Sequence, residues 1–563
     1  MKIEDILKEV VKTENAIIIN GHTLASDTLQ KYDQLISIET EISLEEGLVD
    51  INLFAVIDEP IGVSLPKIYL DTETYDRIKY IPHINEDLSV CVYDENENYR
   101  VNAENLPQIV VDLISEAKRI LRKKDDSKYR QQEFKREFFA YWGLNFSNRD
   151  ELKNIGLCLI DFDSFENLKA IRFEEKLAHY KYLVYNKEDD FKQFQKYLKF
   201  RNLKFTDIEV FKVNFENYTP PYDYTYQESI SFLKKNESFR KKINKLNPID
   251  FLIVFKGSAD ELYGWTYPEL KNRIKGYRKI SSWQFLNSSL GKNRKIRRLS
   301  FSNISPDRLD KRTSGNVTER DINISLIGLG SVGSNLLNYI LKFPVSEYLL
   351  VDPDILKIEN IFRHNYGFNY ISNYKTKILK NNILSKNPFT TVQTEEQDIC
   401  KVLNKDSEVL ESFHFRIIVV GLSRIEIFIL EHLIKINSTK PVLIIWVEPY
   451  LASGQLLFLQ SDDFQIGIEL IKNYPYHILE KNQNFLMKEG SCQSGYYPYS
   501  EANLNLFLSS INQFLYELIV LKKEKTSKIF TWVGNLNFLK ERQIKYKHEY
   551  EGRIFELIEN NVN

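Results

Sequence analysis

The sequence has few of the features that mark secreted, membrane or zinc-scaffold proteins. Only four cysteines occur in 563 residues and none forms a C-x-x-C pair, which argues against a cysteine-rich structural zinc site. The longest apolar run, residues 441–447, is far too short for a membrane span. The N-terminal MKIEDILKEVVK lacks the apolar stretch of a signal peptide. Sparse thiols suit a reducing compartment, so we expect a cytoplasmic protein.

The chain also lacks an excess of charge of either sign. A formal net charge of −2 gives no general reason to expect nucleic acid or a membrane as a partner. With 43% hydrophobic and 27% charged residues, the composition is that of an ordinary globular protein. There is no internal repeat or low-complexity tract. A length of 563 residues exceeds one core and predicts about three domains.

The first two expected domains differ in how readable they are. Residues 1–126 begin with an amphipathic helix and continue with strand-like runs at 35–42 and 49–57 and a helix that has Pro107 near its start. The charged stretch 122–130 is typical of a linker. Residues 127–300 are rich in aromatic residues, so we expect a packed α/β linker domain, but they show no catalytic constellation.

Residues 301–563 alternate strand and helix patterns, which predicts a mainly parallel sheet with helices on both faces. A glycine motif, Gly328-x-Gly330-x-x-Gly333, lies between a strand and a helix, and Asp352 ends the next strand. Glycines there let backbone N–H groups approach a phosphate, and the carboxylate can hold a ribose hydroxyl. Taken alone, this motif is typical of a nicotinamide-dependent dehydrogenase.

The following stretch, DPDILKIENIFRHNYGFNYISNYKTK, resembles the Rossmann-like ThiF-type adenylation fold that ubiquitin-activating enzymes share with bacterial relatives. That family shows D-x-D, then S-N-L-x-R-Q, then a lysine about a dozen residues later. The matching positions here are Asp352, Asp354, Asn360, Arg363 and Lys375. The resemblance implies ATP and Mg²⁺, with Arg363 and Lys375 on the phosphates, where cations neutralise the charge that develops on pyrophosphate.

The match also has departures. His364 replaces the family's glutamine, and the strand IIVVGLSRIE lacks the aspartate that helps to position magnesium. Asp354 or Glu426 is the candidate substitute, and we assign the metal to Asp354. Arg312 resembles an arginine that such enzymes donate across a two-fold interface, which implies a homodimer.

The segment IPHINEDLSVC, which ends at Cys91, resembles the active-site stretch of ubiquitin-conjugating enzymes, where H-P-N-I precedes the catalytic cysteine. Pro82 and Ile84 match in register, while His83 occupies the asparagine position. The resemblance implies an α+β conjugating-enzyme fold for residues 1–126 and a thioester on Cys91. A histidine N–H can stabilise the oxyanion, or the ring can act as a base towards the incoming amine, and the sequence leaves both roles open.

Cys492 lies in the polar segment KEGSCQSGYYPYS, just before a helix that Ser500 can cap. A cysteine in such a loop is exposed, and a nearby helix start favours its thiolate. Loops of this kind resemble those that carry the thioester cysteine of activating enzymes. Cys158 and Cys400 have the surroundings of inert core thiols.

A conjugating-type region and an activating-type region in one chain together resemble the fused proteins of bacterial CBASS antiphage operons. The resemblance implies that the C-terminus of a cyclic-nucleotide-synthesising enzyme (CD-NTase) is activated and attached to an acceptor protein or a small-molecule amine. Three alternatives stay open: an adenylyltransferase acting on a sulfur-carrier or other ubiquitin-like protein, an NAD-dependent dehydrogenase, and a non-catalytic scaffold. Neither the substrate nor the role of residues 127–300 follows from the sequence.

Overall fold

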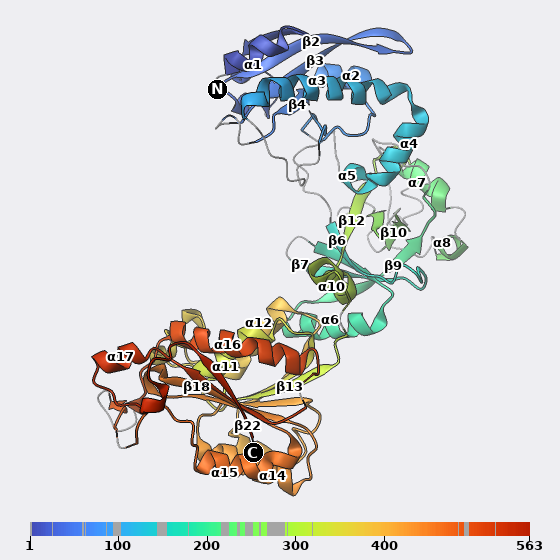
Figure 1. Ribbon diagram of the computed structural model, residues 1–563. Coiled ribbons are helices and arrows are strands. Elements are labelled where there is room, and N and C mark those ends of the chain that lie inside the picture. The colour runs from blue at the N-terminus through green and yellow to red at the C-terminus, as the bar shows by residue number, and fades with distance from the viewer. Residues whose placement is uncertain are drawn as a thin grey trace. The chain divides into compact units, whose positions relative to one another are not determined.

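The structure is a computed structural model that forms two compact units (Figure 1). The N-terminal unit is Met1–Glu188 with Leu203–Ser305, and the C-terminal unit is Asp189–Asn202 with Pro306–Asn563. The described residues are 3–24, 26, 28–58, 61, 64–85, 87–93, 103–142, 155–177, 180–215, 224–233, 237–242, 251–257, 260–266, 288–289, 291–317, 319–481, 483–488, 495–523 and 525–562.

The N-terminal unit begins with a five-stranded antiparallel meander in the order β1-β2-β3-β4-β5. Helices α1 and α3 pack their apolar residues into one core with the strands. The elements are α1 (Ile3–Val10), β1 (Asn15–Ile19), β2 (Leu35–Leu44), β3 (Gly47–Val56), β4 (Lys67–Leu70), α2 (Thr72–Ile78), β5 (Ser89–Val90) and α3 (Leu106–Arg122). The two strands and the proline-started helix expected from the sequence are confirmed.

The same unit contains a closed barrel with strand order β10-β11-β12-β6-β8-β7-β9. All seven strands contribute to one buried cluster that contains no helix residue, and we take this cluster as the barrel interior. A second, aromatic cluster joins strands β9 to β11 to helices α4, α5, α7 and α8. The elements are α4 (Ser127–Arg136), α5 (Phe138–Trp142), β6 (Ile155–Leu159), β7 (Lys169–Leu177), β8 (Tyr180–Tyr185), β9 (Phe205–Lys212), α7 (Tyr226–Leu233), α8 (Glu237–Lys242), β10 (Phe251–Lys256), β11 (Leu262–Thr266) and β12 (Arg297–Asn303).

The C-terminal unit is built on an eight-stranded sheet in the order β15-β14-β13-β16-β17-β18-β21-β22. The first five strands in this order, from β15 through β14, β13 and β16 to β17, run parallel. The other three, β18, β21 and β22, pair antiparallel. Its core strands and helices are β13 (Ile322–Ile327), α11 (Ser331–Ile340), β14 (Val345–Val351), α12 (Lys375–Lys386), β15 (Thr391–Glu395), α13 (Ile399–Lys405), β16 (Phe415–Ile418), α14 (Ser423–Lys435), β17 (Val442–Val447), β18 (Ser453–Leu459), α15 (Phe464–Lys472), α16 (Glu501–Ile519), β21 (Lys528–Val533) and β22 (Leu557–Asn561).

Helices cover both faces of this sheet, as the mainly parallel pattern predicts. Helices α11, α12 and α16 bury their apolar side chains on one face, and α13, α14 and α15 on the other (Figure 1). The same unit includes α6 (Glu188–Phe200), α10 (Pro306–Ser314), α17 (Leu536–Glu541) and the hairpin of β19 (Met487–Lys488) and β20 (Gly495–Tyr496). No helix among the described residues has the length and apolar character needed to cross a membrane.

The linker expected at residues 122–130 is wrong. A 3-10 turn at Lys123–Asp125 is followed directly by α4. The Asp126 carboxylate accepts a hydrogen bond of 2.9 Å from the Tyr129 backbone N–H and so caps the start of the helix. A high density of charged residues is typical of a loop, and this is why the sequence predicted a linker. In the structure, these charged side chains lie on the solvent face of a helix.

Candidate functional site

The glycine turn between β13 and α11 leaves room for a ligand at one of its three glycines. Gly328 has φ +91, and a β-carbon there would lie 2.7 Å from the Val419 carbonyl oxygen, so the fold itself requires this glycine. A β-carbon on Gly333 would lie 2.0 Å from the Gly328 oxygen. A β-carbon on Gly330 would meet nothing within 4 Å. The space beside Gly330 opens at the N-terminal end of α11, where helix N–H groups favour an anion.

Asp352, at the end of β14, is a buried carboxylate fixed by backbone donors. Its Oδ2 accepts 2.6 Å from the Leu329 N–H and its Oδ1 accepts 2.8 Å from the Asp354 N–H. Burial raises the pKa of Asp352, and the nearby Lys375 ammonium opposes that shift. Lys375 is 4% exposed, with Nζ 2.8 Å from Asp354 Oδ2 and 3.6 Å from Asp352 Oδ1. The acidic pair and the lysine, which the sequence identified separately, therefore contact one another.

Arg363 lies in the loop after Asn360, which ends a 3-10 turn at Ile358–Asn360. Its carbonyl accepts bonds from the hydroxyl of Ser331 and, at 3.1 Å, from the amide of Asn335, so the loop is tied to the first turn of α11. Its Nη1 donates 3.3 Å to the Tyr497 carbonyl. Its buried Nε has no hydrogen-bond partner among the described residues, which leaves this donor available to an anion.

His364, which stands where the family has glutamine, is buried and neutral. Burial lowers its pKa to about 3, and the charges of Lys375 and Arg363 add to that shift. Its Nδ1 has no hydrogen-bond partner among the described residues. A neutral imidazole can keep the uncharged hydrogen-bonding character of the glutamine that it replaces.

Of these residues, Gly330, Arg363 and His364 border a cavity of about 600 Å³ in the C-terminal unit. Its lining combines the helix start at Gly330 and Ser331, the cations at Arg363, the end of β17 and an aromatic side built from Phe485, Tyr496, Tyr497 and Tyr499. A cavity of this size accommodates a nucleotide with room for part of a second substrate. An anion-binding end and an aromatic side suit a phosphate-bearing ligand with a planar base.

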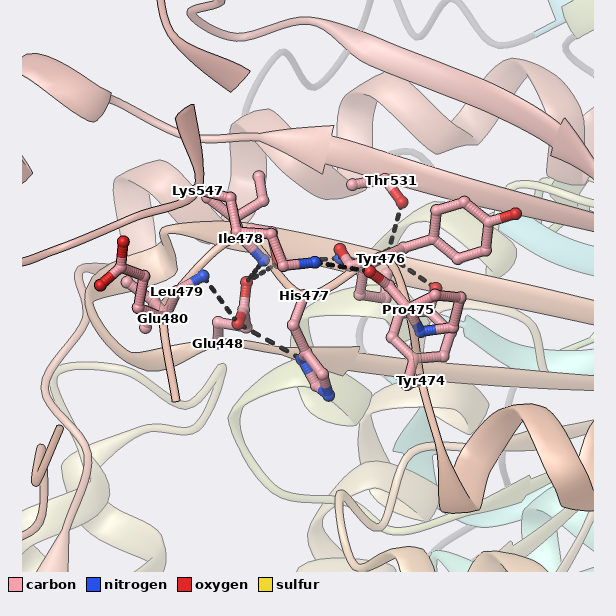
Figure 2. Close-up of polar contacts among 12 residues, drawn as sticks. Glu448, Tyr474, Pro475, Tyr476, His477, Ile478, Leu479, Glu480, Thr531 and Lys547 are labelled. Atoms are coloured by element: carbon pink, nitrogen blue, oxygen red, sulfur yellow. Dashed lines mark hydrogen bonds and ion pairs between the residues drawn. The ribbon is translucent and has the colours of Figure 1, made fainter. Parts of the chain in front are cut away.

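Glu448 closes one side of the cavity, and the sequence analysis did not assign it a role. Figure 2 shows its carboxylate among the backbone of residues 474–480. It accepts 2.9 Å from the Ile478 N–H and 3.3 Å from the Leu479 N–H, and it pairs with His477 Nδ1 at 3.3 Å. Glu448 thus fixes the segment that follows α15 against the end of β17. An acidic residue directly after a buried strand was the signal available in the sequence.

The residues of this unit fit a divalent cation only in part. Asp354 offers an exposed carboxylate, but one oxygen already accepts the Lys375 ammonium. Glu426 is buried at the start of α14, and its Oε1 has no hydrogen-bond partner among the described residues. Burial raises the pKa of Glu426 to about 7, against the lowering effect of the Gly421 and Leu422 N–H groups. Carboxylate oxygens are the ligands that Mg²⁺ prefers, so Asp354 and Glu426 are both candidate metal ligands.

The thiols differ in their surroundings. Cys91 is exposed in the N-terminal unit, beside a turn that contains His83. Cys158 lies inside the barrel, and burial and Asp398 raise the pKa of Cys400 to about 11, so both are poor nucleophiles, as expected. Cys492 lies outside the described residues. Arg312 is exposed on α10, and its expected action across an interface stays a prediction.

The fold and site define a C-terminal α/β unit with a candidate nucleotide site and an N-terminal unit with an exposed cysteine. Residues 17–149 match the family described as Prokaryotic E2 family B, and residues 312–432 match the ThiF family. The combination of an E2-like region with a ThiF-type region is therefore confirmed. Comparison with curated proteins finds no match.

Similar solved structures include PaaA, with 14% identity and a TM-score of 0.30, and Escherichia coli MccB with ATP, with 12% identity and a TM-score of 0.28. MccB alone has 12% identity and a TM-score of 0.30. Each comparison covers 43% of this chain. The chain spans 64% of the PaaA chain, 64% of MccB with ATP and 62% of MccB alone, less than two thirds in every case.

Proposed function

We propose that this chain activates a protein C-terminus with ATP, carries it as a thioester on Cys492 and then on Cys91, and conjugates it to an amine. The observation that carries the proposal is the presence of a ThiF-type nucleotide site and an E2-like exposed cysteine in one chain. A sulfur-carrier adenylyltransferase needs the first but not the second. The helix start at Gly330 would bind the ATP phosphates, with Arg363, which lines the cavity, and Lys375, which lies beside Asp354, as the cations.

Each step of the proposed sequence balances. The substrate carboxylate attacks the α-phosphorus of ATP, and pyrophosphate leaves with charge that Arg363 and Lys375 would neutralise. The Cys492 thiolate then attacks the acyl carbon and releases AMP. The Cys91 thiolate takes the acyl group by thioester exchange and frees Cys492. Finally an amine attacks the Cys91 thioester, loses a proton to give an amide and releases the thiol. Mg²⁺, when bound, would add positive charge at the phosphates.

The protein substrate that we favour is a CD-NTase, in keeping with the resemblance to CBASS fusion proteins, and the acceptor is a protein or small-molecule amine. We place the reaction in the cytoplasm, in a homodimer, with neither nucleic acid nor membrane as a partner. The net charge of −2 supports the last point. The three-domain division at 126 and 300 belongs to the same proposal.

The order in which Cys492 and Cys91 are loaded tests this proposal. In the presence of ATP and a protein with an activatable C-terminus, Cys91→Ala should trap a thioester on Cys492 and abolish the conjugate. Cys492→Ala should still exchange pyrophosphate but leave Cys91 unloaded. Cys400→Ala, which changes a poorly ionised thiol, is the matched control and should behave as wild type. The adducts are assigned by digestion and mass spectrometry without reductant.

The outcomes separate the alternatives. Normal loading of Cys91 in the Cys492 variant would replace the relay with direct transfer from the adenylate. Pyrophosphate exchange without any thioester in the wild type would indicate an adenylyltransferase that does not use these thiols. Purified protein that retains NAD and shows no exchange would point to a dehydrogenase.

A further inference from the structure

Cys91 ends a short hairpin that begins at His83, and we call this segment the cysteine turn. The Cys91 N–H donates 2.7 Å to the His83 carbonyl, and Ile84 bridges Val90 in antiparallel fashion between them. His83 itself has φ +67. A residue with a β-carbon in that region costs about 1 kcal/mol or more, so contacts from elsewhere must hold it there.

Those contacts come from helices α4 and α5. The His83 N–H donates 2.6 Å to the Tyr141 hydroxyl oxygen, and that hydroxyl donates 2.9 Å to Glu137 Oε2. The ring nitrogens face two carboxylates, with Nδ1 3.2 Å from Glu137 Oε1 and Nε2 3.6 Å from Glu133 Oε2. Both the backbone and the ring of His83 are therefore held by the same helix pair. We call Glu133, Glu137 and Tyr141 the His83 clamp.

The arrangement fits an imidazolium better than a metal. The three side chains do offer one ligand atom each within 4.8 Å of one another. However, the two carboxylates face different ring nitrogens, whereas one metal ion binds only one of them. The hydrogen bond to Glu137 raises the pKa of His83, against the effect of burial, and the Glu137 and Glu133 charges act in the same direction. The other titratable or charged groups near the clamp are Arg136, Tyr129, Glu116, Arg119 and Cys91.

The clamp helices are in turn anchored in the barrel. Phe134, Phe138 and Trp142 belong to the aromatic cluster that contains residues of β9, β10 and β11. The Trp142 Nε1–H donates 2.8 Å to the Leu299 carbonyl of β12. The same short helices thus contact the barrel strands through their apolar side chains and His83 through their polar ones.

We propose that the barrel region buttresses the cysteine turn: His83 is a positioning residue, held as an imidazolium by the His83 clamp, and through its carbonyl it fixes the backbone of Cys91. With both ring nitrogens occupied, the His83 side chain is neither the oxyanion donor nor the base in this state. This inference rests on the proposed function only for the chemistry at Cys91. It gives residues 127–300 a role in the reaction.

Hydrogen exchange of the full-length protein tests the clamp without ATP or substrate. In the double variant Glu133→Gln/Glu137→Gln, the backbone amides of residues 81–91 should exchange about tenfold faster at pH 7. Local opening of this segment costs less free energy in the variant, because it no longer has to break the contacts of the His83 clamp. Glu73→Gln, which neutralises an exposed carboxylate on α2, is the matched control and should exchange as wild type. If strands β2 and β3 also exchange faster, the double variant has lost its fold. Tyr141→Phe, which removes only the hydroxyl, then decides.

A pH series adds a readout that a merely structural contact would not move. The folded state raises the pKa of His83, so the clamp is complete below the usual histidine pKa and is lost as the pH rises through the raised value. Protection of residues 81–91, corrected for intrinsic exchange, should fall across that window, and Glu137→Gln should move the fall to lower pH. If residues 81–91 exchange at the wild-type rate in both Glu133→Gln/Glu137→Gln and Tyr141→Phe, the clamp is wrong. Protection that appears only with added Zn²⁺ and disappears with chelator would overturn the imidazolium.

The proposed function and the clamp fail separately. If exchange accelerates as expected but no acyl group loads Cys91, the conjugating activity is wrong and the clamp stands. If Cys91 loads, and the double variant discharges its thioester to an amine at the wild-type rate, His83 does not position the reaction.

Discussion

At the scale of single residues, the candidate nucleotide site has one buried cation between two carboxylates. Lys375 contacts Asp354 directly and faces Asp352, which backbone donors hold in place. A lysine so deeply buried is uncommon without compensating charge. The Asp354 carboxylate balances the charge of the buried ammonium, and a bound phosphate could take its place. The sequence spacing indicated the participants but not that they pair with one another.

We expect Lys375→Ala to slow pyrophosphate exchange by about 100-fold or more, because a cation facing the leaving group is lost. Lys377→Ala, two residues along α12 and 61% exposed at its side chain, should leave the rate unchanged. Steady-state exchange with ATP varied gives kcat and KM for both variants. Circular dichroism checks that loss of the buried charge has not unfolded α12. A wild-type rate in folded Lys375→Ala would remove the lysine from the mechanism.

His364 should make the C-terminal unit sensitive to acid. Its folded pKa of about 3 lies below the unfolded value near 6.5, so its contribution to stability is complete above pH 6.5 and is lost as the pH falls. Between pH 7.5 and 5.5 the wild type should lose about 1 kcal/mol more than His364→Gln. Urea unfolding of both proteins, with His548→Gln as an exposed-histidine control, measures the difference. Equal losses in all three would contradict the assignment of a buried neutral ring.

At the scale of elements, the long periodic segments were predictable and the short charged ones were not. Helix α16 has a buried apolar stripe, and Ser500 caps its start as expected by accepting 3.1 Å from the Asn503 N–H. The repeating leucines fix such a helix locally. Helix α4 instead has a single buried residue, Phe134, so its sequence carries no apolar period. Its existence depends on a cap and on packing against the barrel.

Because α4 depends on its cap, removing the cap should measurably lower the stability of the N-terminal unit. Asp126→Ala should destabilise the N-terminal unit by about 1 kcal/mol, because the Tyr129 N–H loses its acceptor. Asp126→Asn retains an acceptor and should recover most of the loss. Chemical denaturation, with hydrogen exchange of α4 as the readout, gives the free energy of unfolding of each variant. If alanine and asparagine destabilise equally, the carboxylate charge rather than the cap supports the helix, since Asp126 also lies 3.7 Å from Lys123.

At the scale of the whole molecule, the sequence indicated two candidate regions because each carries local motifs. The glycine turn, the acidic pair and Cys91 lie in short segments whose spacing encodes geometry. The His83 clamp and the Glu448 network join residues far apart in the chain, with separations of 58 between His83 and Tyr141 and 30 between Glu448 and Ile478. No local pattern reports such contacts, because the fold brings them together. The barrel, whose residues come between these two regions in the sequence, was not predicted for the same reason.

The last prediction concerns assembly. If Arg312 acts on the nucleotide of a second copy, each site of a homodimer needs Arg312 from one chain and Lys375 from the other. Arg312→Ala and Lys375→Ala should each be nearly inactive alone. After mixing under conditions that exchange subunits, half of the dimers are mixed, and one site in each carries neither lesion. The mixture should therefore recover about a quarter of the wild-type pyrophosphate exchange. Mixing Lys375→Ala with Lys375→Arg/Arg312→Ala is the control, since every site then lacks one of the two residues. No recovery in the first mixture, together with a monomer in sedimentation at micromolar concentration, would place Arg312 outside the reaction.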